Sequence, residues 1–407
     1  MSMLENFFDI KKNSRDLFAG LEISASEELC SQWMNQCPTV SLSFRQVDGL
    51  DFSSAYDMLT MVISNLFNRH RYLLESQEIS EFQKTAFVQI ASQKATAGEI
   101  KNSLILLTDM MQTYYGKKVL LLLDEYDVPV AKANNNGYYE EMLDVMKGLM
   151  QALKDNRALG FAVVTGCMKI AKESIFTGTN NFVSNTITSS HLNEYYGFVQ
   201  SEVDKILEDA GIKGKEEVIK KWYDGYHFGD WDVYCPWDVM NYVLELQHNP
   251  QAKPAGYWKN TSDNAIIRSF IDYAGGSITR KLEILMEGGY IIQQIDKNLT
   301  YDYLHSSEDN LWSVLYLTGY LTQVRPETLN RELPAGSAAL QIPNAEIREI
   351  FETTVIRWFD DSAKTWNRNH LFAAVWKGDS EAVTKEMTAL LRRTHSYHDY
   401  REAFYHA

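Results

Sequence analysis

Cysteine is scarce in this chain, and its few cysteines form no recognisable motif. Four occur among 407 residues, with no C-x-x-C pair and no zinc-site spacing: Cys30, Cys37, Cys167 and Cys235. Disulfide frameworks and structural zinc sites both require regularly spaced cysteines. Scattered thiols are typical of a protein in a reducing compartment, so we expect a cytoplasmic location.

Long apolar runs are also missing. No stretch approaches the ~18 consecutive apolar residues that a membrane-spanning helix needs. The segment Met1 to Lys12 contains no apolar core of the kind found in secretory signal peptides. We therefore expect neither a membrane partner nor secretion.

Positive charge is in deficit. Lys and Arg number 39 against 54 Asp and Glu, which gives a formal net charge of -15. A broad basic surface for nucleic acid is therefore not expected, although a local basic groove remains compatible with this composition. The nine histidines form no H-x-x-H or H-E-x-x-H metal pair. Hydrophobic content of 45% indicates a globular chain, and the length suggests two or three domains.

The most informative segment that is present runs from Lys117 to Asp127. Five aliphatic residues in a row are followed by the adjacent acids Asp124 and Glu125. Such a run predicts a strand buried in a parallel sheet, which delivers both acids to the carboxyl edge where open α/β folds bind ligands. This is the pattern of a Walker B strand, in which the first acid holds Mg²⁺ through water and the second polarises the attacking water. In many α/β proteins a buried strand ends in Asp-Glu by chance. The segment alone therefore leaves two interpretations open, a nucleotide site and a chance sequence at a strand end.

The companion motif of a nucleotide site is absent. No G-x-x-x-x-G-K-[ST] sequence occurs anywhere in the chain. That loop grips phosphates with backbone N–H groups, a lysine and a Ser/Thr ligand of Mg²⁺. Asp124 and Glu125 do not replace it, because carboxylates repel a polyanion in the absence of Mg²⁺ and lysine. No cofactor is therefore expected for this chain alone.

The pattern of apolar residues alternates between strand and helix over the first half of the chain. Strands are expected at 38–47, 118–124, 159–165 and 182–189. Helices are expected at 3–8, 55–72, 98–115 and 138–154, with a polar loop at 134–137. This alternation predicts a parallel sheet with right-handed crossovers, in which the strands 38–47, 118–124 and 159–165 are adjacent in that order and Asp124 lies near the end of the strand that closes at Thr165. The strand at 182–189 is expected either to leave a gap beside 159–165 or to pair with it. After about residue 190 helices dominate, and they are expected at 194–210, 213–223, 345–359 and 379–393. Three other segments interrupt them: an aromatic, turn-rich stretch at 222–229, a helix-to-turn element at 311–325 and a connection at 331–345.

A polar residue closes the strand at 159–165. In P-loop ATPases of the additional-strand group, a residue in the position of Thr165 senses the γ-phosphate and helps place the attacking water. A plain threonine at a strand end is the alternative, and it is favoured when Thr165 is considered alone. Lys169 and His227 are weaker candidates for an approach to phosphate.

Several separate stretches carry a family resemblance when they are taken together. In chain order they are Leu17-Phe18-x-Gly20-Leu21-x-Ile23, Cys37-Pro38-Thr39-Val40, Leu122-Leu123-Asp124-Glu125-Tyr126-Asp127-x-Pro129, Thr165-Gly166 leading to Ser174-Ile175-Phe176-Thr177-Gly178, Trp222-Tyr223-Asp224-Gly225-Tyr226, Tyr234-x-Pro236-Trp237, Tyr257-Trp258-x-Asn260-Thr261-Ser262 and Phe404-Tyr405-His406. They resemble a bacterial AAA-ATPase-like family whose members carry a PD-(D/E)XK-type nuclease domain at the C-terminus. The stretches run in order over nearly the whole chain, and the resemblance depends on their combination.

The resemblance implies a domain organisation. Residues 1–190 correspond to an α/β ATPase domain without Walker A, 191–330 to a helical or winged-helix-like lid, and 331–407 to a helical connection toward a nuclease domain. In the family the P-loop precedes the helix that begins here at Met1, and the nuclease acid and E-x-K strand would lie beyond Ala407. The chain is therefore expected to be an internal fragment whose sheet lacks its central first strand. Glu402 and His406 are weaker candidates for accessory nuclease residues.

Two functions compete at this stage. The first is a fragment of an ATPase whose intact form binds and hydrolyses ATP-Mg²⁺ to control an appended nuclease, with Glu125 and Thr165 as catalytic residues and Asp124 as the Mg²⁺ holder. That function implies ATP as partner, nucleic acid through the nuclease domain, and a homo-oligomer. The alternative is a non-enzymatic interaction or scaffold protein of the same fold. A nuclease in its own right is not expected, because the acidic and E-x-K strands are absent.

Overall fold

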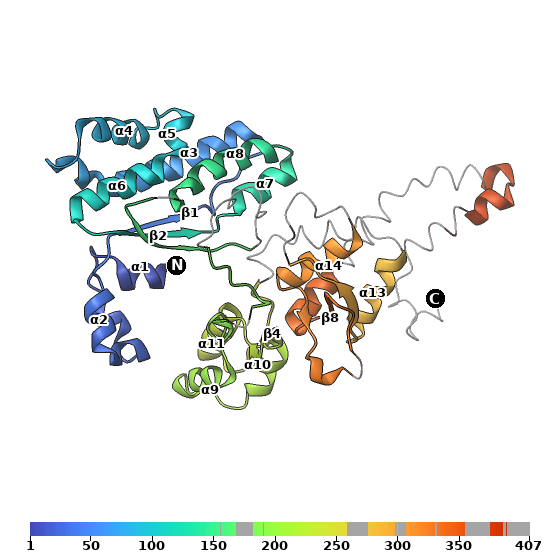
Figure 1. Cartoon of the computed structure of the whole chain (residues 1–407). Helices are drawn as coiled ribbons and strands as arrows, with labels where there is room; N and C mark the ends of the chain where they lie inside the picture. The colour runs from blue at the N-terminus through green and yellow to red at the C-terminus, as the bar shows by residue number, and fades with distance from the viewer. Residues whose placement is uncertain are drawn as a thin grey trace. The chain divides into compact units, whose positions relative to one another are not determined.

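The computed structural model describes residues 1–154, 156–167, 182–189, 191–258, 276–297, 299, 307–329, 332–354, 375–385 and 388. Lys169, Glu402 and His406 lie outside these residues. The described chain is a mixed α/β protein that divides into two compact units (Figure 1). The first comprises Met1–Val183 and Asn298–Leu304, and the second comprises Ser184–Lys297 and His305–Ala407.

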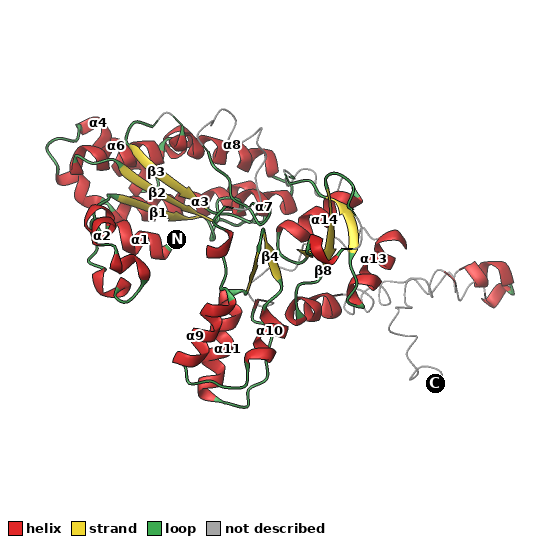
Figure 2. Ribbon diagram, turned by 60° about the horizontal axis from the view of Figure 1, so that its bottom comes forward, coloured by secondary structure: helices red, strands yellow, loops and turns green. Residues whose placement is uncertain are grey.

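The first unit is built on a three-stranded parallel sheet. Its strands are β1 (Thr39–Ser43), β2 (Val119–Asp124) and β3 (Leu159–Val164), and they lie side by side in the order β1-β2-β3 (Figure 2). The predicted positions of these three strands, their parallel direction and their order are confirmed. Residues 119–123 of the central strand are all buried, which agrees with the uninterrupted aliphatic run.

Helices accompany this sheet on both of its sides. They are α1 (Ser2–Phe8), α2 (Glu27–Trp33), α3 (Phe52–Arg69), α4 (Glu81–Ala91), α5 (Ala97–Lys101), α6 (Ser103–Tyr115), α7 (Val128–Asn136) and α8 (Tyr139–Met150). Figure 1 shows α3 to α8 on one side of the sheet and α1 and α2 on the other. As predicted, α6 ends at Gly116, which takes the left-handed conformation that a helix C-terminus favours in glycine.

Three expectations for this half of the chain are wrong. Residues 182–189 form no strand, because a strand needs a partner for its backbone hydrogen bonds and none of the described residues pairs with them. The supposed polar loop at 134–137 is instead the last turn of α7, with Gly137 as its left-handed cap. The helix expected at 98–115 is divided at Asn102 into α5 and α6.

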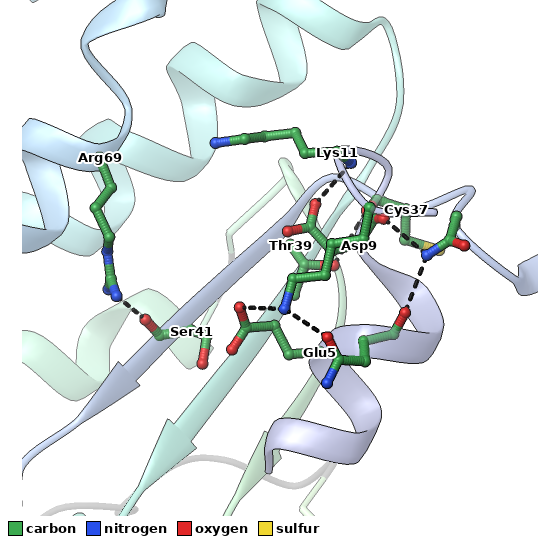
Figure 3. Close-up of polar contacts among 10 residues, drawn as sticks. Glu5, Asp9, Lys11, Cys37, Thr39, Ser41 and Arg69 are labelled. Atoms are coloured by element: carbon green, nitrogen blue, oxygen red, sulfur yellow. Dashed lines mark hydrogen bonds and ion pairs between the residues drawn. The ribbon is translucent and has the colours of Figure 1, made fainter. Parts of the chain in front are cut away.

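The two edges of the sheet differ. Along β1, the guanidinium of Arg69 donates to the carbonyl oxygen of Ser41 over 2.9 Å, and Asp9 forms a parallel bridge with Cys37 (Figure 3). Along β3, the described residues add no further strand, and 67% of the Phe161 side chain is exposed. One edge is thus covered, whereas at the other no described residue pairs with the backbone of β3 and an aromatic ring is exposed.

The second unit contains helices and two small antiparallel sheets. Its helices are α9 (Gln200–Asp209), α10 (Glu216–Tyr223), α11 (Pro236–His248), α13 (Gly276–Met286), α14 (Glu308–Leu317) and a further helix over residues 345–354, and its strands are β4 (Tyr226–Phe228), β5 (Trp231–Val233), β6 (Ile291–Gln294), β7 (Thr322–Gln323) and β8 (Ser337–Gln341). Strands β4 and β5 form a hairpin, and the other three pair in the order β6-β8-β7. The stretch at 222–229 therefore contains a strand, and the expected connection at 331–345 contains β8. Among these described residues no helix is long and apolar enough to cross a membrane.

Candidate functional site

The carboxyl edge of the parallel sheet brings two of the predicted site residues into contact. Asp124 is the last residue of β2, and Thr165 directly follows β3. The hydroxyl of Thr165 donates to Asp124 Oδ1 over 2.5 Å. The Thr165 amide donates to Leu123 O over 2.9 Å, so the strand pairing itself fixes this meeting.

Glu125 turns the chain sharply out of β2. Its φ of 52° lies in the left-handed region, which costs a residue with a side chain about 1–2 kcal/mol. Burial raises the pKa of this carboxyl, and the neighbouring acids Asp124 and Asp127 raise it further, whereas Arg45 acts in the opposite direction. A strained residue with a raised pKa at the end of a central strand is characteristic of a functional site.

The loops after the two strands are tied together by Asp127. The amide of Cys167 donates to Asp127 Oδ1 over 3.2 Å and to Oδ2 over 3.1 Å. Between them, a Cβ added at Gly166 would lie 2.5 Å from Asp127 Oδ1 and 2.6 Å from the ring of Tyr126. Only glycine fits this close approach, and the loop position of Thr165 depends on it.

Three residues of this edge were not predicted from the sequence. Arg45 follows β1 at the same edge, and Asp127 and Gly166 hold the loops after β2 and β3. The Thr165-Gly166 pair and the third acid of the Asp-Glu-Tyr-Asp run were available as signals. No signal in the sequence pointed to Arg45, because a single arginine after a strand is common.

The predicted residue His227 belongs to the second unit. It lies in β4, where its Nδ1 is 3.1 Å from Asp232 Oδ1 on the paired strand β5. Asp232 also forms an ion pair with Arg325 over 2.5 Å. In the second unit, His227 thus takes part in a local polar network.

The contacts of α1 show which way this helix points (Figure 3). Its carboxyl end is held at the start of β1, where the Ile10 amide donates to Cys37 O over 2.9 Å. Glu5, one turn earlier, is a hydrogen-bonding neighbour of Ser41, further along the same strand, and forms an ion pair of 2.9 Å with Lys12. The amino end of α1 is therefore directed toward the carboxyl edge of β1, the edge at which Asp124 and Thr165 meet.

The chemistry of this edge is compatible with Mg²⁺ held mainly by water and a ligand. The described residues contain no group of three or more His, Cys, Asp or Glu side chains that could hold a metal ion by themselves. Mg²⁺ bound with a nucleotide keeps several waters and takes only one or two carboxylates from the protein. Asp124, half-buried and hydrogen-bonded through one oxygen, fits that role.

Comparisons with known proteins found a family model and a relative to which this chain is similar. Residues 1–176 match the family model described as "Predicted AAA-ATPase", AAA-ATPase-like. The chain is also similar to an uncharacterized protein in the vnfD 5′ region of Azotobacter chroococcum mcd 1, with 24% identity over 257 residues. The matched region is 61% of this chain and 45% of that protein, so the chain spans less than half the length of the curated relative it matches. No solved structure matches. The first 176 residues are thus similar to a family of predicted AAA-ATPases.

Proposed function

We propose that the first unit supplies the acid-bearing half of an ATP-Mg²⁺ site, and that the intact protein hydrolyses ATP there. The observation that carries this proposal is the bond between Thr165 Oγ1 and Asp124 Oδ1 at the carboxyl edge of a parallel sheet. Open α/β sheets bind ligands at this edge. The match of residues 1–176 to predicted AAA-ATPases supports the same assignment.

Each residue of the edge has a separate role in this proposal. Asp124 holds Mg²⁺ through water. Thr165 donates its one hydroxyl proton to the Asp124 carboxylate and accepts a hydrogen bond from the attacking water, which it helps to place. Glu125 accepts a proton from the attacking water, and its raised pKa brings its basicity closer to neutral pH. When bound, Mg²⁺ neutralises charge on the phosphate oxygens.

The proposal extends to the rest of the intact protein. The amino end of α1 is directed toward the acids, as the helix after a phosphate-binding loop would be. The sequence itself holds no Gly-Lys-Ser/Thr loop, so the phosphate grip would come from elsewhere in the intact protein. Residues 191–330 would act as a winged-helix-like lid and 331–407 as the connection to a nuclease that ATP hydrolysis controls.

Three substitutions test the proposed roles in the protein encoded by the longest open reading frame that contains residues 1–407. Glu125→Gln should retain nucleotide and lower hydrolysis about 10²–10⁴-fold, the usual contribution of a general base. Asp124→Asn should weaken Mg²⁺-dependent binding itself, and Thr165→Val should reduce kcat. Glu141→Gln, at an exposed position of α8, is the matched control. Equal hydrolysis by the wild type and Glu125→Gln would remove Glu125 from the mechanism.

The absence of the phosphate loop favours a second candidate, a scaffold protein that keeps this fold without its chemistry. The DNA just upstream of the first codon separates the two. In-frame codons for a Gly-Lys-Ser loop would support the ATPase, whereas a stop codon or unrelated sequence would support the scaffold.

A further inference from the structure

Two carboxyl groups are buried together in the second unit. Asp238 lies in the first turn of α11, and Glu346 lies in the first turn of the helix over residues 345–354. Each is only 1% exposed to solvent. The two are hydrogen-bonding neighbours, so the amino ends of two helices meet at a pair of acids.

Ordinary donors do not satisfy this pair. Glu346 Oε1 accepts from the Trp258 amide over 2.8 Å. Glu346 Oε2 and Asp238 Oδ1 are buried and have no hydrogen-bond donor. Ionised carboxylates only accept hydrogen bonds, so two of them facing each other leave both oxygens unpaired and add charge repulsion. A single proton shared by the two carboxyl groups supplies a donor within the pair and removes one charge.

We propose that Asp238 and Glu346 share one proton and form a pH-sensitive latch that joins α11 to the helix over residues 345–354. The latch belongs to the second unit and does not depend on the proposed ATP site.

Glu346 is the member that carries the proton near neutral pH. Burial and then the charge of Asp238 raise its pKa to about 8. Burial raises the pKa of Asp238 too, but hydrogen bonds with Cys235 and with the Trp258 amide act in the opposite direction.

The thiol and the phenol groups around the pair remain neutral over the relevant range. Burial raises the pKa of the Cys235 thiol and of the Tyr223, Tyr226 and Tyr257 hydroxyls, the last to about 12. Glu349, on the same helix as Glu346, contributes a further negative charge. Between pH 5 and 8, loss of the shared proton is therefore the titration that most changes the charge of the latch.

The latch lies where two hydrophobic clusters of the second unit meet. One cluster surrounds α11 and includes Tyr223, and Tyr257 packs against it. The other surrounds α14 and the helix over 345–354, and Tyr226 and Trp258 pack against that one.

The backbone is close-packed at the same place. Gly225, at φ 101°, lies so near Pro343 that an added Cβ would collide with the Pro343 carbonyl oxygen. Three of the sequence stretches that carry the family resemblance, 222–226, 234–237 and 257–258, thus converge on the two acids.

Linkage fixes the direction of the pH effect. The folded-state pKa of Glu346, about 8, lies above its ordinary value of 4.5. The folded unit therefore binds more protons than the unfolded unit between these values, and stability falls as pH rises from about 4.5 to about 8. The opening constant of the latch rises by at most about tenfold per pH unit over that interval, because one proton is released.

Hydrogen exchange on the full chain tests the latch. Between pH 5 and 9, and after correction for the intrinsic exchange rate, opening of the peptides that contain Trp258 and residues 345–354 should increase with pH. Glu346→Gln should abolish this increase, because an amide donates to Asp238 Oδ1 as the protonated acid does. Glu352→Gln, a half-buried carboxyl on the same helix, is the matched control and should keep the wild-type pH dependence.

A second variant keeps the test decisive. In Asp238→Asn, the amide can donate to Glu346 Oε2, so the midpoint of the pH dependence should fall below that of the wild type. An unchanged pH dependence in Glu346→Gln, or an unfolded Glu346→Gln protein at every pH, would overturn the proposal, since the amide reproduces the protonated state.

Discussion

At the scale of single residues, Gly166 decides whether Thr165 can reach Asp124. Its missing side chain lets the loop after β3 lie against Tyr126 and Asp127. Gly166→Ala should therefore destabilise the first unit by about 1–3 kcal/mol, the usual cost of overpacking. Urea unfolding measures this change. Gly98→Ala is the control, because its Cβ would meet nothing closer than Thr96 Oγ1 at 4.0 Å, and a helical Gly→Ala change is stabilising. Equal effects of the two substitutions would contradict this packing argument.

The residues of the candidate site could be predicted only in part. Asp124 and Thr165 were expected to be neighbours because parallel strands share one carboxyl edge, and the structure places them in contact. Their catalytic roles, and that of Glu125, stay predictions. The Asp127 bonds to the Cys167 amide could not be predicted, because they depend on how two loops fold against each other.

At the scale of elements, the sequence predicted those with a strong local signal. The aliphatic run gave β2, and Gly116 marked the end of α6. The asparagine-rich end of α7 was expected to be a loop, because asparagine has weak helix propensity. The helix nevertheless continues through it, since a Pro in its first turn and the left-handed cap at Gly137 favour the helix. The segment 182–189 is rich in the β-branched residues that strands favour, but none of the described residues pairs with it, and a segment without a pairing partner makes no strand.

The outer edge of β3, with which none of the described residues pairs, leads to a prediction about association. An open strand edge with an exposed aromatic ring is a template for pairing with another chain. Phe161, 67% exposed on that strand, should therefore promote self-association. Phe161→Lys should shift sedimentation velocity profiles of residues 1–407 toward the monomer. Phe82→Lys removes a ring that is 83% exposed on α4, where no strand edge is present, and serves as the control. A similar shift in both variants would attribute association to general hydrophobicity instead of the edge.

At the scale of the whole molecule, the chain carries a net charge of -15, and its candidate site presents acids without a phosphate-binding loop. Backbone amides, a lysine and a hydroxyl ligand supply most of the phosphate grip in such sites, and the carboxylates alone repel the polyanion. Residues 1–407 should therefore bind ATP-Mg²⁺ no more tightly than about 1 mM, a free energy of about -4 kcal/mol. Isothermal titration calorimetry gives this constant directly, and the protein from the longest open reading frame provides the comparison. Micromolar binding by residues 1–407 would show that the chain holds a phosphate-binding element other than the Gly-Lys-Ser/Thr loop, and the proposed division of the site would then be wrong.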